Sequence, residues 1–289
     1  MERLLCILCF ILSVSAIKAE NRALLIGIGH YASGTEWSPI HGDADVELLR
    51  PMLVKRGFSD IRTLVNNEAT KQAIVTELKS LRNRCQSGDK VYFHFSGHGQ
   101  PIEDINEDEM DEFDESIIPY NASKYACRGK YEGQNHLIDD EYNPLLNAIK
   151  KKLGKEGQLF IAIDACYSKG MERGTNDDID DIDIVGSARG TDEPFVVAGH
   201  SSYLKRVPKP KRFDSGASLA IVSACLQTER NYEHKTYTGK IYGSLTYYIY
   251  TLLKTNADYT RWVECFKSED YRRYRIFQHS QHPTITLYR

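Results

Sequence analysis

Short apolar runs alternate with segments of helical spacing along most of the chain, and this pattern constrains the fold more than any other feature. Strands are predicted over residues 23–28, 61–65, 90–95, 159–163, 217–225 and 284–288. Helices are predicted over residues 44–55, 70–84, 140–153, 242–254 and 258–274. Strands that alternate with helices form parallel sheets, because each helix brings the chain back to the end of the sheet at which the previous strand began. The sequence therefore predicts an α/β fold built on a mostly parallel sheet.

The composition is typical of a globular protein and excludes several classes of partner. The chain has 289 residues, of which 41% are hydrophobic and 27% are charged, which excludes a disordered or multi-span membrane protein. Its 37 Lys and Arg residues and 40 Asp and Glu residues leave a formal charge of -3. Since no basic domain is available to neutralise a phosphate backbone, we expect no nucleic-acid partner.

The first 19 residues have the pattern of a secretory signal peptide. A short charged start precedes an apolar run over residues 4–17, and small residues follow it before Glu20. The run is shorter than the roughly 20 residues that a spanning helix needs. We predict cleavage after Ala19, no permanent membrane span, and a secreted or periplasmic location. The remaining chain, residues 20–289, is predicted to form one domain, and its odd number of cysteines leaves at least one thiol free.

Two of the predicted strands end in residues that can carry out chemistry. Residues 96–99 read Ser-Gly-His-Gly after one strand, and residues 164–166 read Asp-Ala-Cys after another. Because the carboxyl ends of parallel strands share one edge of a sheet, His98 and Cys166 are expected to face one crevice. An imidazole can take the proton of a thiol nucleophile and later protonate an amine leaving group. The backbone N–H groups of Gly99 and Cys166 can serve as an oxyanion hole.

These residues resemble those of the caspase and metacaspase cysteine peptidases. The resemblance covers residues 22–253 and rests on segments 22–29, 92–99, 110–119, 138–141, 164–168 and 223–225. It implies a caspase-like three-layer sandwich, in which a mostly parallel sheet of about six strands is flanked by helices. It also implies a cysteine endopeptidase whose catalytic dyad is His98 and Cys166. Such an enzyme acts on proteins or peptides and needs no cofactor for its chemistry. We expect a monomer.

The chain departs from the usual metacaspase pattern directly after Cys166. Metacaspases usually carry a histidine next to the nucleophile and a glycine two residues further on, where this chain has Tyr167 and Lys169. Neither position belongs to the dyad. The departure therefore leaves the chemistry intact and concerns only the shape of the following loop.

Acidic residues are predicted to form the specificity pocket. The resemblance places Asp43, Ser96 and Asp164 at pocket positions of metacaspases, and residues 37–42 contain no arginine of the kind with which caspases bind aspartate. Recessed carboxylates favour a guanidinium or an ammonium group, so cleavage after Arg or Lys is predicted. Asp43 also stands where a helix begins, and its alternative role is a helix N-cap.

Nine carboxylates crowd between residues 103 and 115, which raises the question of a bound cation. An EF-hand loop is excluded, because its sixth position holds Glu109 instead of glycine. The resemblance to calcium-activated metacaspases instead implies the ligands Asp114, Asp139 and Asp140, with Glu172 as an approximate fourth. Calcium is thus a possible activator, and the alternative is a solvated acidic face.

Residues 168–216 lose all periodicity and are predicted to form an exposed linker loop. Such stretches are preferred sites of proteolysis, and we predict self-cleavage there after Arg173, Arg189 or Arg206. A dinucleotide-binding fold is excluded because the glycine motif at residues 27–32 leads into a loop and not into a helix. A catalytically silent caspase-like module that binds peptides or partners stays open as the alternative function.

Overall fold

The computed structural model describes residues 19–103, 113–167, 188–197, 213, 215–255, 259–278 and 280–288. The predicted signal peptide lies outside the described residues except for Ala19, as do most of the predicted linker 168–216 and the possible ligand Glu172. Among the described helices, none combines the length and the apolar character needed to cross a membrane.

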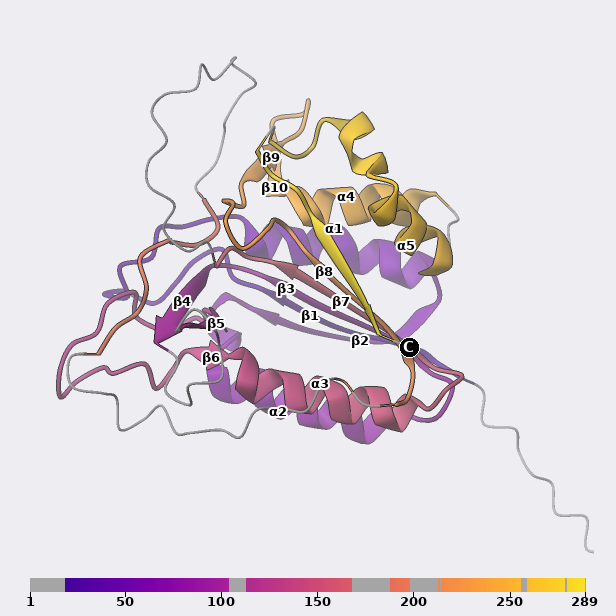
Figure 1. Ribbon diagram of the computed structural model, residues 1–289, viewed down its shortest axis with the longest axis horizontal. Coiled ribbons are helices and arrows are strands. Elements are labelled where there is room, and N and C mark those ends of the chain that lie inside the picture. Colours follow the sequence, from indigo (N-terminus) through magenta and orange to yellow (C-terminus); the bar gives the residue numbers. More distant parts are fainter. Residues whose placement is uncertain are drawn as a thin grey trace, which may run out of the picture.

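A six-stranded sheet forms the centre of the molecule (Figure 1) and has the strand order β11-β8-β7-β3-β1-β2. Its strands are β1 (Asn21–Gly27), β2 (Phe58–Val65), β3 (Lys90–Ser96), β7 (Gln158–Asp164), β8 (Ser218–Ser223) and β11 (Thr284–Tyr288). All neighbouring strands pair in parallel except β11, which runs antiparallel to β8. The sheet confirms the predicted α/β fold with six mostly parallel strands.

Helices cover both faces of this sheet and complete three layers (Figure 1). One face carries α2 (Lys71–Arg84) and α3 (Asp139–Leu153); the other carries α1 (Gly42–Lys55), α4 (Ser244–Lys254) and α5 (Tyr259–Lys267). Alternate strand residues serve the two cores: Leu24 and Ile26 pack toward α2 and α3, whereas Ala23 and Leu25 pack toward α1 and α4. A strand buried on both faces reads as a continuous apolar run, which is why the sequence revealed these strands.

The last predicted helix is divided in two. Within the range predicted as one helix, the structure has α5 (Tyr259–Lys267) and a separate 3-10 helix, η2 (Asp270–Tyr274). Between them, Glu269 has a φ of 54°, which lies in the left-handed region and ends the preceding helix.

Two small antiparallel sheets lie at the end of the molecule where the parallel strands finish (Figure 1). They consist of β4 (Gly99–Glu103), β5 (Phe113–Ile117) and β6 (Leu137–Ile138), and of β9 (Glu233–Lys235) and β10 (Ile241–Gly243). Part of the predicted linker is hydrogen-bonded to the sheet that contains β4, because the Phe195 N–H donates to the Pro101 carbonyl at 2.8 Å. Phe195 and Arg189 are 1% and 0% exposed. Within residues 188–197, Arg189, Phe195 and Val197 are therefore buried, which the predicted exposed loop did not anticipate, whereas Val196 is exposed.

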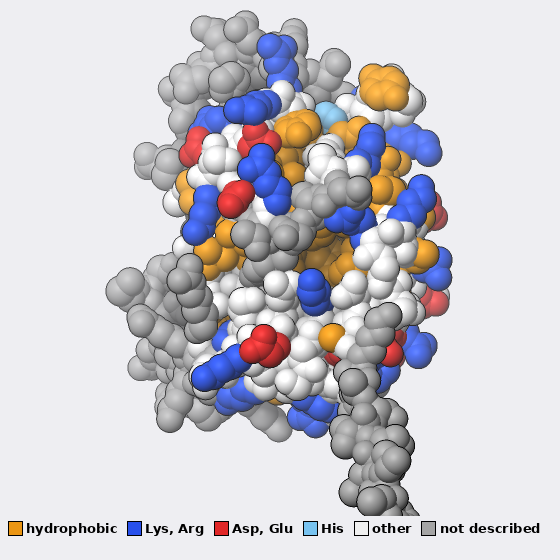
Figure 2. Space-filling model, turned by 90° about the vertical axis from the view of Figure 1, so that its right-hand side faces the viewer, with side chains coloured by type: hydrophobic (Ala, Val, Ile, Leu, Met, Phe, Trp, Pro, Cys, Tyr) orange, Lys and Arg blue, Asp and Glu red, His pale blue; other side chains and the backbone are white. Residues whose placement is uncertain are grey.

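The opposite end of the molecule carries the amino ends of the parallel strands. Figure 2 shows that lysine and arginine side chains are scattered over this face among apolar and neutral ones. Among the coloured, described residues of this face, they form no continuous basic stripe.

Candidate active site

The two predicted dyad residues lie just beyond the carboxyl ends of neighbouring strands. In the parallel pair β3 and β7, Ser96 lies opposite Asp164, and two further residues bring each strand to His98 and Cys166. The backbone of Gly99 lies directly against Cys166: a Cβ atom at Gly99 would come within 2.4 Å of the Cys166 carbonyl oxygen. His98 and Cys166 are 3% and 2% exposed. The fold thus places the predicted nucleophile and base, both buried, just beyond the carboxyl ends of adjacent strands.

The imidazole of His98 is held in the form that can accept a proton. Its Nε2 lies 2.9 Å from the Ser38 carbonyl oxygen; because a carbonyl only accepts, Nε2 carries the proton and Nδ1 the lone pair. Nδ1 is buried and has no hydrogen-bond partner among the described residues. Burial lowers the pKa of His98 to about 4, although the bond to Ser38 opposes this shift. The ring also stacks on Trp37 with centroids 4.7 Å apart, which fixes its orientation.

The thiol of Cys166 has a second thiol beside it. Cys166 Sγ donates to the Glu229 carbonyl oxygen at 3.1 Å, and Cys225 Sγ donates to the same oxygen at 3.4 Å. A hydrogen bond to Cys166, followed by burial, raises the pKa of Cys225 far above that of an ordinary thiol. Cys225 therefore keeps its proton.

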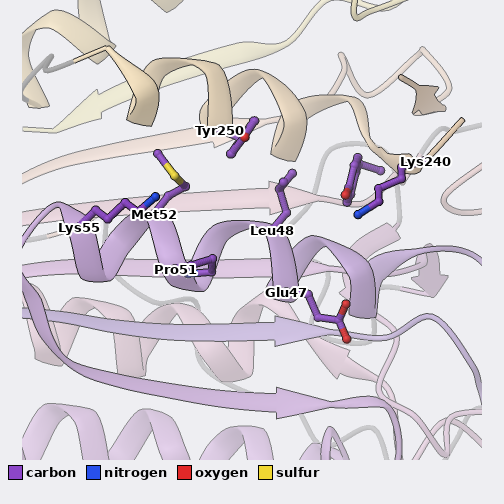
Figure 3. A pocket seen from close by; sticks show the side chains of 8 residues that line it. Glu47, Leu48, Pro51, Met52, Lys55, Lys240 and Tyr250 are labelled. Carbon is purple, nitrogen blue, oxygen red and sulfur yellow. The ribbon is translucent and has the colours of Figure 1, made fainter. Parts of the chain in front are cut away.

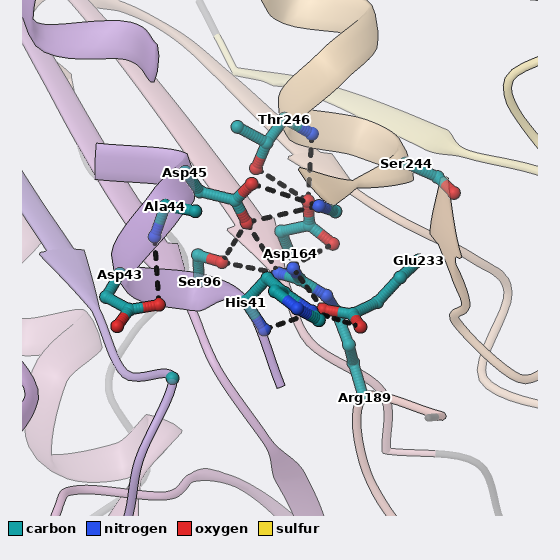
Figure 4. Close-up of polar contacts among 12 residues, drawn as sticks. His41, Asp43, Ala44, Asp45, Ser96, Asp164, Arg189, Glu233, Ser244 and Thr246 are labelled. Carbon is teal, nitrogen blue, oxygen red and sulfur yellow. Dashed lines mark hydrogen bonds and ion pairs between the residues drawn. The ribbon is translucent and has the colours of Figure 1, made fainter. Parts of the chain in front are cut away.

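A buried acidic pocket lies next to the dyad, and the side chain of Arg189 fills it (Figure 4). The guanidinium Nη1 is 2.8 Å from Asp45 Oδ2, 2.5 Å from Ser96 Oγ and 3.8 Å from Asp164 Oδ1. The other terminal nitrogen, Nη2, is 2.9 Å from Glu233 Oε1. Burial alone would lower the pKa of Arg189, but the three carboxylates raise it above the ordinary value, so the guanidinium stays charged.

Each pocket carboxylate is also held by groups other than Arg189. Asp164 accepts hydrogen bonds from Asn231 Nδ2 at 2.7 Å and from Thr246 Oγ1 at 2.6 Å, and Asp45 accepts one from the Gly243 N–H at 3.0 Å. Burial raises the pKa of Asp45 to about 6, opposed by Arg189. These bonds hold the carboxylates in place, so their arrangement does not depend on Arg189 alone.

The backbone of Arg189 runs across the nucleophile. Its carbonyl oxygen accepts a hydrogen bond from the Cys166 N–H, which was predicted to belong to the oxyanion hole, and its N–H donates to the Asn231 carbonyl at 2.9 Å. The next residue, Gly190, forms a bridge with Cys166. A Cβ atom at Gly190 would lie 2.2 Å from the Cys166 carbonyl oxygen. Only glycine permits so close an approach at this position.

The structure separates Asp43 from the other predicted pocket residues, Ser96 and Asp164. Asp43 Oδ2 accepts from Asn66 Nδ2 at 3.1 Å, and Oδ1 accepts from the Ala44 N–H at 2.9 Å. Asp43 is the second residue of α1 and does not cap it, because the N-cap is His41. Asp45 takes the pocket position instead, for it lies on the buried stripe of α1 with Leu49 and Leu53. The helical spacing of these three residues was a signal that could have identified it.

Three acidic residues gather at a second place, between β5 and the start of α3. Asp114, Asp139 and Asp140 each offer a carboxylate oxygen, and these oxygens lie within 4.8 Å of one another. Carboxylates held this close repel one another, and a divalent cation would relieve that repulsion. Hard oxygen ligands suit calcium, so the predicted set fits the ion.

A groove lies between α1 and α4 (Figure 3). Its lining consists of Glu47, Leu48, Pro51, Met52, Lys55, Lys240, Tyr242 and Tyr250. None of these is a residue of the predicted dyad or of the acidic pocket.

Comparison with known proteins decides the family. Residues 21–172 match the metacaspase, peptidase C14 domain. The chain belongs to the metacaspases. It is 30% identical over 253 residues to metacaspase-3 of Arabidopsis thaliana, covering 82% of this chain and 60% of the relative. It is 24% identical over 266 residues to metacaspase-1 of Mycosarcoma maydis, covering 81% and 62%. This metacaspase chain thus spans about 60% of the length of these curated relatives.

Solved structures share the fold of this metacaspase. A protein from Geobacter sulfurreducens superposes with a TM-score of 0.61 at 18% identity, covering 93% of each chain. Caspase-1 from Spodoptera frugiperda superposes with a TM-score of 0.54 at 12% identity, covering 93% of this chain and 88% of its own. These likenesses confirm the predicted caspase-like fold.

Proposed function

We propose that this metacaspase is a cysteine endopeptidase that cleaves after Arg or Lys. One observation carries the proposal: Arg189 places its guanidinium among three carboxylates while its carbonyl oxygen accepts the N–H of Cys166. A substrate residue bound in the same way would present its carbonyl carbon to the nucleophile. The catalytically silent module is the weaker alternative, because both dyad residues are present and the basic nitrogen of His98 has no other partner among the described residues.

Each residue of the site has a separate role in the proposed reaction. His98 Nδ1 takes the proton of Cys166 Sγ as the sulfur attacks the carbonyl carbon, and the N–H groups of Cys166 and Gly99 bind the resulting oxyanion. His98 then gives the proton to the leaving amine, and a thioester remains. Water, deprotonated by His98, hydrolyses the thioester to a carboxylate and restores the thiol. The Ser38 carbonyl supports the imidazolium that forms transiently, since it accepts the proton on Nε2.

We propose further that the first substrate of the enzyme is its own Arg189–Gly190 bond. This bond is one of the three self-cleavage sites predicted from the sequence; the other two, after Arg173 and Arg206, lie outside the described residues. Its support is the pose of Arg189, whose side chain and carbonyl occupy the places that a substrate residue needs. The uncut chain would then occupy its own pocket and compete with other substrates.

Peptide amides that differ only in the residue before the scissile bond test the proposed activity. Purified protein is expected to release the reporter group from substrates ending in Arg or Lys and not from one ending in Asp. Cys166→Ala is the matched control and should abolish the release. Preference for Asp would overturn the pocket assignment, and peptide binding without turnover would support the silent module.

The proposal extends to a calcium ion, to the location of the protein and to its oligomeric state. Asp114, Asp139 and Asp140 are proposed to hold an activating calcium ion. Export is proposed on the leader pattern of residues 1–19 alone, and sequencing the amino terminus of the mature protein would test it, with Glu20 expected first. The proposed monomer is tested by the mass in solution of the Cys166→Ala variant.

A further inference from the structure

The acidic pocket treats the two terminal nitrogens of Arg189 differently. Asp45 and Ser96 both contact Nη1, and Asp164 lies further from the same atom. Glu233, which comes from β9 in a separate part of the chain, contacts Nη2. The pocket thus has one subsite that any single cationic nitrogen could fill and a second that needs another nitrogen in the same plane.

The second subsite is built in advance. The Glu233 side chain is 1% exposed, and its two oxygens are shared between Arg189 and His41. His41 donates its backbone N–H to Oε1 at 2.8 Å, and its ring Nδ1 lies 2.8 Å from Oε2. His41 immediately precedes α1, so these bonds tie Glu233 to the helix that carries Asp45. The carboxylate is therefore aimed at the Nη2 position by contacts that do not depend on what fills the pocket.

We propose that Glu233 is the residue that makes this pocket select arginine over lysine. The inference rests on the proposed function and refines it. A lysine side chain has one terminal nitrogen, and placing it beside Asp45 leaves Glu233 Oε1 buried without a cationic partner. An arginine satisfies both subsites through its planar fork. Asp45 and Asp164 supply charge to either residue, whereas Glu233 distinguishes between them.

The test compares kcat/KM for two peptide substrates that differ only in Arg or Lys before the scissile bond. Both are measured in an Arg189→Ala background, so that the internal arginine does not compete. With Glu233 present, the Arg peptide is expected to be cleaved roughly tenfold to a hundredfold more efficiently, as a charge-assisted hydrogen bond implies. Glu233→Gln should reduce cleavage of the Arg peptide by about that factor, and change cleavage of the Lys peptide by less than about threefold.

The ratio of the two rates separates a specificity role from a structural one. Loss of fold or of pocket shape would lower both rates together. Asp45→Asn is the comparison variant: it is also expected to lower both rates, because Asp45 supplies charge to either residue. Equal losses for both peptides with Glu233→Gln, or an unchanged Arg-to-Lys ratio, would overturn the proposal. Failure of the enzyme with Glu233 intact to cleave either peptide would instead overturn the proposed function itself, on which this inference depends.

Self-cleavage gives a second measurement that needs no added substrate. In the otherwise unchanged chain, Arg189→Lys is expected to slow cleavage at residue 189 by at least about tenfold. In a Glu233→Gln background, the chain that keeps Arg189 and the chain with Arg189→Lys should be cut at similar rates. A similar rate for both residues while Glu233 is intact would contradict the assignment.

Discussion

The backbone N–H of Cys166 donates a hydrogen bond of 2.8 Å to the carbonyl oxygen of Arg189. In the proposed reaction this N–H group binds the oxygen of the carbonyl that the sulfur attacks, so the Arg189 carbonyl occupies the position proposed for a substrate carbonyl. Arg189 also fills the acidic pocket, so side chain and backbone occupy the site together. The uncut enzyme therefore resembles a complex with its own chain.

Removing the internal arginine should change both processing and access to the site. Arg189→Ala is expected to abolish cleavage between residues 189 and 190, because the pocket loses the cation that it binds. The new amino terminus of the incubated protein, read by sequencing, is expected to be Gly190 in the parent chain and absent in the variant. Cys166→Ala is the control for an outside protease. Cleavage at residue 190 in that control would contradict self-processing.

Two aspartates in one turn of α1 provide a matched pair of substitutions. Asp45→Asn should lower kcat/KM for Arg substrates by roughly tenfold to a hundredfold, because a buried guanidinium loses a charged partner. Asp43→Asn should change it by less than about threefold, because Asp43 bonds to Asn66 outside the pocket. The reverse result would restore Asp43, the residue that the sequence alone suggested, to the pocket.

Buried histidines should make the fold sensitive to acid. Burial lowers the pKa of His94 and His98 to about 4 and that of His136 to about 3. Between these values and the unfolded pKa of about 6.5, the unfolded chain binds more protons, so stability falls as the pH falls. Asp45, with its pKa raised to about 6, acts in the opposite direction. Unfolding near pH 5 should thus take up roughly two protons through these four groups.

Denaturant titrations of Cys166→Ala between pH 7 and pH 4.5 measure this effect without self-cleavage. The free energy of unfolding is expected to decrease with acid by roughly 2–3 kcal/mol per pH unit near pH 5. His136→Gln should reduce the slope by about one half, because it removes about one of the two protons taken up. A free energy that stays constant or increases toward pH 4.5 would contradict the burial of these imidazoles in neutral form.

Calcium should raise activity through the acidic group at the start of α3. Chelator is expected to lower the rate on Arg peptides, and added calcium to restore it. Asp140→Asn, which removes one charge from the group, should shift the calcium response to concentrations at least about tenfold higher. A rate that is unaffected by chelator and calcium would leave these carboxylates as a solvated acidic surface.

The sequence predicted the dyad because its signals were local. Strands buried on both faces appear as continuous apolar runs, and the chemistry stands immediately after them at His98 and Cys166. The pocket was predicted only in part. Arg189 contacts Asp45, and Glu233 contacts His41, from segments that lie more than 140 residues further along the chain. Local periodicity in the sequence cannot reveal such contacts. The choice of Asp43 relied on motif position, whereas the helical spacing of Asp45 with Leu49 agreed with the structure.

The two strands on either side of the proposed cut are direct neighbours in the sheet. β7 ends before Arg189 and β8 begins after Gly190, and the two pair in parallel from Gln158 to Ile163. Phe195, downstream of the cut, is buried against β4 and pairs with Ile102, upstream of it. Hydrolysis would therefore remove a covalent link without separating what it linked. The product would elute as one particle in native buffer and migrate as two polypeptides once denatured.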